Sequence, residues 1–270
     1  MLDRIREMKF KRESSDEELH FSQPVGQPGI AWNWEETPYN PGWHEPTFEV
    51  LQRHIPNESR VLEVGAGGSY ALTALVKRNG CAGFGVEPDT DGLRRLRRFA
   101  QTAGVSVDLI QGDGFALPFD DAAFDVVYSQ GLVEHFEEAQ TADLLSEHRR
   151  VCRDNGVVIV SVPNQWNLLH TLRKKILGTR YEYYPERSYT PSKLNELLRS
   201  CGLQVVAVDG VLPLWPFGIF SSWWRVLVVL ERLGLLQKIN NMKRPTWRAH
   251  AGMMTYAIAR KVPHEQRGHH

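Results

Sequence analysis

The sequence predicts an α/β fold in which a mainly parallel sheet is covered by helices on both faces. Seven short apolar segments rich in β-branched residues recur along the chain, and helical patterns separate most of them. They span residues 61–64, 83–86, 105–110, 124–129, 157–162, 205–208 and 254–258. A glycine cluster directly follows the first segment, as in α/β nucleotide pockets. We find no internal repeat and no low-complexity linker, so these segments belong to one sheet.

Composition limits the classes of partner. The chain has 270 residues, of which 42% are hydrophobic and 24% charged, which is an ordinary soluble composition. Its 32 basic residues balance its 32 acidic residues, so no overall field draws it onto nucleic acid or an anionic membrane. Cys81, Cys152 and Cys201 have no metal-ligand or paired spacing, and the charged N-terminus is unlike a signal peptide. We expect a cytoplasmic protein with reduced thiols.

The sequence predicts four helices from their periodicity and from residues that start or end a helix. After the glycine cluster a helix over about 70–78 should end at Asn79-Gly80. A helix over 91–103 carries "GLRRLRRFA", with leucines on one side and arginines on a solvated side. A third helix over about 139–153 precedes the turn and buried strand of "DNGVVIVSVPN". A late helix should start with Thr190 as its cap and Pro191 in its first turn.

The stretch "RVLEVGAGGSYALTALVKRNG", residues 60–80, decides which cofactor fits. A dinucleotide fingerprint needs a third glycine, and Tyr70 stands at that position. Instead, Glu63 lies two residues before Gly65, and Gly67 and Gly68 allow a ligand to approach the backbone. A carboxylate facing the pocket favours a cationic amine over a pyrophosphate.

Residues from about 60 to 164 resemble the class I S-adenosylmethionine-dependent methyltransferases, particularly the branch that includes ubiquinone and menaquinone biosynthesis. The segment "VLEVGAGGS" is similar to their first motif. The resemblance implies that Glu63 holds the methionine amine, while Gly65, Ala66 and Gly67 pass beneath the cofactor. Ser69 departs from the family pattern, because many members carry a further glycine there. The family also implies a Rossmann-like sheet of seven strands with the last one antiparallel.

Two further motifs bear on the nucleoside. In "GFGVEPD", Glu87 with Pro88 ends the second strand, where a carboxylate accepts ribose hydroxyls; NAD enzymes use the same geometry. In "QGDGFALPF", the resemblance implies that Asp113 accepts the adenine amino group, with Gly114 and Phe115 lining the same side. The alternative for Asp113 is a plain turn residue.

A fourth motif, "FDVVYSQGLVEHF", reaches the carboxyl end of the sheet, where open α/β folds place their chemistry. Ser129 and Gln130 should meet the cofactor there. Glu134 and His135 are the candidate catalytic residues, because a histidine titrates near neutrality and can remove a proton from an acceptor hydroxyl or amine. The alternative is that this pair only orders the loop and the helix start.

Two specialised reactions are disfavoured. Metal-assisted catechol-type enzymes use an acidic cluster near the fourth and fifth strands, whereas this chain has Ser129 and Asn164 there, so we expect no metal. DNA aminobase enzymes place a Pro-Pro-Tyr-type tetrad after the fourth strand, and "SQGL" differs from it.

We expect one domain in five parts. Residues 1–58 form an N-terminal segment and aromatic lid, 59–165 the S-adenosylmethionine-binding core, and 166–190 a substrate-cover insertion. Residues 191–262 complete the domain, with an apolar insertion at 211–250, and 263–270 form a tail. The lid contains Trp32, Trp34, Tyr39, Trp43 and His44, which alternatively pack against the sheet edge.

The two insertions should choose the substrate. The first carries Lys174, Lys175, Arg180 and Arg187 with four tyrosines, which suit an anionic or sugar-bearing acceptor or, alternatively, a solvated helix. The apolar segment 211–238 is interrupted by prolines and charges, so it falls short of the roughly 20 apolar residues of a membrane span. Its alternatives are a hydrophobic substrate tunnel, a homodimer interface and weak membrane contact.

The sequence therefore predicts a methyltransferase that moves a methyl group from S-adenosylmethionine to O, N or C of a small or amphipathic metabolite by in-line displacement. An NAD-dependent oxidoreductase and a non-catalytic methyltransferase-like binding protein are the alternatives.

Overall fold

A computed structural model describes residues 41–67, 69–178, 186–211 and 245–261. Several predicted features lie outside these residues. They are the aromatic residues Trp32, Trp34 and Tyr39, Arg180 with Tyr181, Tyr183 and Tyr184, most of the apolar segment 211–238, and the tail 263–270.

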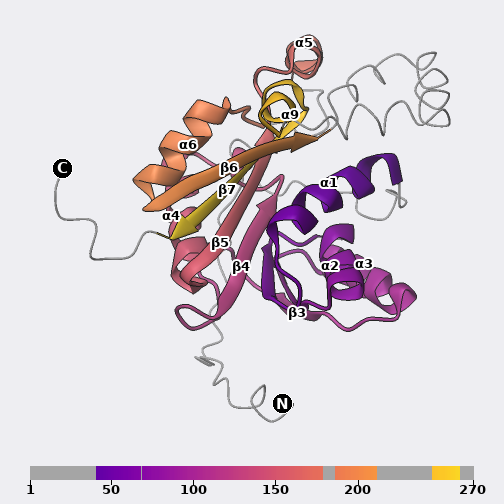
Figure 1. Cartoon of the computed structure of the whole chain (residues 1–270). Coiled ribbons are helices and arrows are strands. Elements are labelled where there is room, and N and C mark those ends of the chain that lie inside the picture. Colours follow the sequence, from indigo (N-terminus) through magenta and orange to yellow (C-terminus); the bar gives the residue numbers. More distant parts are fainter. Residues whose placement is uncertain (1–40, 68, 179–185, 212–244, 262–270) are drawn as a thin grey trace.

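The described strands form one sheet of seven, in the order β3-β2-β1-β4-β5-β7-β6 (Figure 1). The strands are β1 (Arg60–Val64), β2 (Ala82–Glu87), β3 (Asp108–Gln111), β4 (Phe124–Gln130), β5 (Cys152–Pro163), β6 (Leu203–Val211) and β7 (Met254–Lys261). Strands β1 to β5 pair with one another in parallel, while β7 is antiparallel to both β5 and β6. The predicted sheet with an antiparallel last strand is confirmed.

Helices cover both faces of the sheet, and each face has its own core. The helices are α1 (Pro41–His54), α2 (Tyr70–Asn79), α3 (Thr90–Ala103), α4 (Glu138–Val151), α5 (Leu168–Leu177), α6 (Pro191–Ser200) and α9 (Pro245–Ala251), with a 3₁₀ turn η3 (Val133–His135). One core joins α1, α2 and α3 to the sheet through Leu51, Leu72 and Leu96. The other joins α4 and α6 to the opposite face through Leu144 and Leu198.

Local signals set two helices as predicted. Ser69 caps α2 by accepting the Leu72 amide at 3.3 Å, and Gly80 ends the helix with φ 67°. Thr190 accepts the Lys193 amide at 3.1 Å, and Pro191 occupies the first turn of α6.

Other boundaries differ from the prediction. Residues 41–54 form the helix α1, although Pro46 lies inside it. Its buried Phe48 and Leu51 pack on the sheet, so tertiary burial outweighs the missing amide. Helix α4 ends at Val151 rather than 153, since β5 already begins at Cys152, and β3 begins at Asp108 rather than 105.

Candidate functional site

The glycine loop after β1 folds over the end of β2. The amides of Gly65 and Ala66 donate to the Val86 carbonyl at 2.9 and 3.1 Å. The Gly67 amide donates to Glu87 Oε2 at 2.9 Å. Because β1 and β2 are parallel neighbours, the loop and Glu87 meet at the carboxyl edge of the sheet.

Two positions require glycine, one in the loop and one in the strand β2 beneath it. Gly65 has φ +73°, which side chains avoid, and a Cβ there would lie 3.0 Å from Leu132 Cδ1. A Cβ on Gly85 would lie 3.0 Å from Ala66 Cβ, so β2 also needs glycine where the loop crosses it. The first requirement follows the predicted motif, whereas Gly85 was not predicted.

Glu63 is buried beneath this loop, where it accepts a hydrogen bond of 2.7 Å from the Tyr128 hydroxyl. Burial raises the pKa of Glu63 to about 7, and the nearby negative charge of Glu87 adds to the rise. A carboxylate held in this way is stabilised by a cation, because a positive ligand offsets the cost of its desolvation.

Glu87 is also buried and is held by the backbone. In addition to the Gly67 amide, the Asp89 amide donates to Glu87 Oε1 at 3.1 Å. Burial raises its pKa to about 7. Two carboxylates with raised pKa values therefore share one glycine-lined edge, as expected of a functional site.

The predicted adenine loop joins the same edge. The Gly112 amide donates to the Glu87 carbonyl at 3.3 Å, which brings Asp113 beside the end of β2. Asp113 Oδ1 accepts the Phe115 amide at 3.0 Å, which is the turn role that was the alternative for this residue. The Phe115 ring packs edge-on against Phe136, with ring centroids 5.0 Å apart.

The end of β4 supplies two further predicted residues. Ser129 is buried, and its Oγ has no hydrogen-bond partner among the described residues. Gln130 Oε1 accepts the Tyr256 hydroxyl at 3.1 Å, which ties β4 to β7. Pro88, which follows Glu87 at the end of β2, is exposed, and its carbonyl accepts Gln111 Nε2 at 3.1 Å.

Glu134 and His135 lie in the turn η3, and both are buried. Glu134 Oε2 has no hydrogen-bond partner within the described ranges. Burial raises the pKa of Glu134 well above its usual value, and the charge of Glu186 adds to the rise. The Arg187 amide donates to the Glu134 carbonyl at 3.0 Å, so this turn is joined to the 166–190 segment.

That segment contains a buried polar cluster that was not predicted as a unit. Lys174 Nζ lies 2.8 Å from Glu186 Oε1, and His170 Nε2 lies 3.3 Å from the same oxygen. Lys174 is one of the basic residues predicted to suit an anionic acceptor or, alternatively, a solvated helix, and its ammonium contacts Glu186 and Ser188. His170 and Glu186 meet only in the folded chain, so their spacing in the sequence does not predict this contact.

Tyr128 and Tyr256 were also missed. Tyr128 pairs directly with Glu63 in the register of β1 and β4, and neighbouring residues in register share a face of the sheet. Its position could have been found by aligning the two predicted strands. Tyr256 depends on β7 entering the sheet between β5 and β6, which no local pattern indicates.

Two features are absent from the described residues. No group of three or more His, Cys, Asp or Glu side chains in the described ranges is arranged to hold a metal ion. In the same part of the chain, no helix has the length and apolarity to cross a membrane.

The chain is similar to known methyltransferases in sequence and in fold. Residues 62–160 match a family described as a methyltransferase domain. The ubiquinone biosynthesis O-methyltransferase of Azorhizobium caulinodans is 26% identical over 195 residues, which are 66% of this chain and 74% of that protein. A probable S-adenosylmethionine-dependent methyltransferase of Mycolicibacterium smegmatis is 30% identical over 171 residues, covering 62% of this chain and 60% of that one.

A solved structure shares the fold. It is the Burkholderia thailandensis 1,6-didemethyltoxoflavin-N1-methyltransferase with bound 1,6-didemethyltoxoflavin and S-adenosylhomocysteine. The TM-score is 0.56 at 18% identity, over 82% of this chain and 78% of that one. The sheet order and these matches lead to one conclusion: residues 62–160 match a methyltransferase domain, and the chain is similar in sequence and in fold to S-adenosylmethionine-dependent methyltransferases.

Proposed function

We propose that this enzyme transfers the methyl group of S-adenosylmethionine to an oxygen, nitrogen or carbon atom of a small or amphipathic metabolite. The observation that carries the proposal is the pair of buried carboxylates, Glu63 and Glu87, on either side of the loop 65–67. S-adenosylmethionine has an ammonium and a sulfonium, and a site of this charge favours such a ligand over a pyrophosphate.

The residues fit the parts of this cofactor. Glu63 would hold the methionine ammonium, because it is the more deeply buried carboxylate and opposes a cation best. Glu87 would accept the ribose hydroxyls, and Asp113 would accept the adenine amino group. Gly65 supports this assignment, since its positive φ turns the loop and the absence of a Cβ lets the backbone pass close to the Leu132 side chain.

S-adenosylmethionine, when bound, supplies a methyl group already activated by its positive sulfur. The protein then has to orient the acceptor in line with that methyl group and keep water away. Ser129 and Gln130 end β4 at the edge where these groups would meet. The buried hydroxyl of Ser129 is a candidate to orient the acceptor, because it has no partner within the described part of the chain.

Proton removal would be the task of His135 or Glu134. Burial raises the pKa of Glu134 well above its usual value, which disfavours the charged carboxylate that a general base must be. His135 is the better candidate by residue type. Its burial in η3 equally supports a structural role, so the two roles of His135 need a direct test.

Two observations favour an acceptor with polar and apolar parts. Exposed Leu168, Leu172 and Ile176 form a stripe along α5, which begins shortly after the carboxyl end of β5. The half-buried Lys174 and its partner Glu186 lie on the same segment beside Glu134. The names of relatives include both an O-methyltransferase and an N1-methyltransferase, so both atom types belong in the first screen.

The test is calorimetric titration with S-adenosylmethionine, S-adenosylhomocysteine and NAD, followed by transfer of labelled methyl to a panel of phenols, amines and amphipathic hydroxy compounds. We expect S-adenosylmethionine and S-adenosylhomocysteine to bind and NAD to give no binding heat. Binding without transfer to any acceptor would favour the non-catalytic alternative, and NAD binding alone would overturn the proposal.

A further inference from the structure

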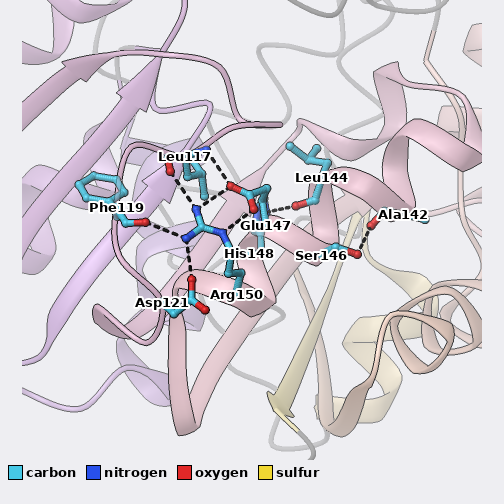
Figure 2. A network of polar contacts seen from close by, with 9 residues as sticks. All are labelled: Leu117, Phe119, Asp121, Ala142, Leu144, Ser146, Glu147, His148 and Arg150. Carbon is cyan, nitrogen blue, oxygen red and sulfur yellow. Dashed lines mark hydrogen bonds and ion pairs between the residues drawn. The ribbon is translucent and has the colours of Figure 1, made fainter. Parts of the chain in front are cut away.

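Helix α4 runs beside the loop that joins β3 to β4, and it contacts this loop through one face. Leu144, Glu147 and Arg150 are spaced three residues apart and therefore lie on the same side of the helix. A Cβ on Gly114 would lie 2.9 Å from Leu144 Cδ1, so the beginning of the loop is pressed against the helix. The later part of the loop is bound by the other two side chains (Figure 2).

The guanidinium of Arg150 is fully used in this contact. Its Nη1 donates to the Phe119 carbonyl at 2.7 Å and to Asp121 Oδ1 at 2.9 Å. Its Nη2 donates to the Leu117 carbonyl at 2.9 Å and to Glu147 Oε2 at 2.8 Å, and its Nε donates to Glu147 Oε1 at 2.6 Å. All five N–H donors of the side chain thus have acceptors.

Glu147 completes the contact from the same helix. The Leu117 amide donates to Glu147 Oε2 at 2.8 Å, so both backbone polar groups of Leu117 are bound by α4. Figure 2 shows the two side chains of Arg150 and Glu147 together facing the loop backbone. Leu117 and Phe119 are also buried in the core, so the backbone here has one well-defined position.

The bound backbone is close to Asp113. The Ala116 amide donates to the Asp113 carbonyl at 3.2 Å, and the Phe115 amide donates to Asp113 Oδ1 at 3.0 Å. One turn therefore separates Asp113 from Leu117. The position of Leu117 therefore limits where this turn, and the Asp113 carboxylate within it, can lie.

We propose that Arg150 and Glu147 are positioning residues that set the selectivity of the enzyme for the adenine base, by fixing the loop that carries Asp113. The inference rests on the proposed function, in which Asp113 accepts the adenine amino group. A lysine at 150 keeps the charge, but its single ammonium does not reproduce the planar fork that binds two carbonyls and two carboxylates together.

If Arg150 and Glu147 had a purely structural role, replacing either residue would lower stability and would lower the affinity for every nucleoside alike. A positioning role changes the preference between nucleosides. The test is therefore titration of wild type, Arg150→Lys and Glu147→Gln with S-adenosylhomocysteine and with S-inosylhomocysteine, whose base has a carbonyl oxygen in place of the amino group. Arg94→Lys is the matched control, because Arg94 pairs with Asp91 on the exposed surface of α3.

We expect wild type and Arg94→Lys to prefer S-adenosylhomocysteine by about tenfold or more, because the exchanged group removes a hydrogen bond to a charged acceptor. In Arg150→Lys this preference should fall to about threefold or less, and Glu147→Gln should change it in the same direction. Circular dichroism and thermal unfolding establish that each variant is folded.

Each other outcome overturns a distinct statement. A folded Arg150→Lys with the wild-type preference overturns the positioning role alone, and if this variant does not fold, an unchanged preference in Glu147→Gln does the same. Wild type without a preference overturns the role of Asp113 and this inference with it. Wild type that binds neither compound overturns the proposed function.

Discussion

At the scale of single residues, Glu63 and Glu87 determine the charge of the site. We expect Glu87→Gln to weaken S-adenosylmethionine binding by about 1–3 kcal/mol, because an amide accepts hydrogen bonds less strongly than a carboxylate and carries no charge. Calorimetry measures the change. Glu196→Gln, at an exposed position of α6, is the control and should bind as wild type does. Equal affinity in both variants would remove Glu87 from the site.

The same two residues predict a pH dependence. Their pKa values are raised from 4.5 to about 7, so the folded protein binds more protons than the unfolded chain between these values. The stability of the free protein should therefore fall as pH rises through this window. Affinity for the cationic cofactor should rise between about pH 6 and about pH 8, because the carboxylates become charged. In Glu63→Gln the slope of affinity against pH should decrease, and an unchanged slope would contradict the assignment.

For His135, the predicted role as a base gives a clear expectation. Replacing it with Asn should lower kcat by about 10²-fold or more without changing the affinity for S-adenosylmethionine, because a base acts only on the acceptor. Single-turnover rates with labelled methyl, once an acceptor is known, measure this. Unchanged turnover in a folded variant would assign His135 to the structure of η3.

At the scale of elements, the turn between β1 and α2 depends on the conformation of Gly65. Gly65→Ala should lose about 1–2 kcal/mol of stability, because φ +73° is unfavourable for alanine. It should also weaken cofactor binding, since the new Cβ meets Leu132 Cδ1 at 3.0 Å. Gly104→Ala is the control, with φ +71° and nothing within 4 Å. Equal cofactor affinity in the two variants would contradict the role of the loop.

At the scale of the whole molecule, Asp209 connects the beginning and end of the described chain. This buried carboxylate on β6 lies 2.7 Å from Arg53 of α1 and 2.9 Å from Arg248 of α9. Burial alone would raise the pKa of Asp209, but its contacts with His54, Arg53 and Arg248 hold it well below the usual value. Its contribution to stability is therefore present at neutral pH and lost only as pH falls through that low value.

We expect Asp209→Asn to lower the free energy of unfolding by about 3–5 kcal/mol, because it leaves the buried Arg248 without its carboxylate. Urea unfolding at neutral pH measures the difference. Asp154→Asn is the control, since the Asp154 side chain is 74% exposed and should change stability little. A loss equal to that of the control would mean that water compensates Arg248.

The prediction from sequence was accurate where the signal is local or tied to a motif. Alternation of apolar segments gave the seven strands, and Gly80 and Thr190 set helix ends because their interactions span only a few residues. Helix α1 was not predicted, because Pro46 argues against a helix at these positions. The helix is stabilised by tertiary burial of Phe48 and Leu51, which no local pattern indicates.

The sequence by itself determined the seven strands and their order along the chain, the glycine loop and the carboxylates at positions 63 and 87, because strand ends and glycine requirements are local properties. Only the tertiary structure decided that Tyr128 binds Glu63, that Arg150 and Glu147 hold the Asp113 loop, and that Asp209 meets Arg53 and Arg248. These contacts join residues far apart in the chain, and their geometry exists only after parallel strands align their carboxyl ends at one edge.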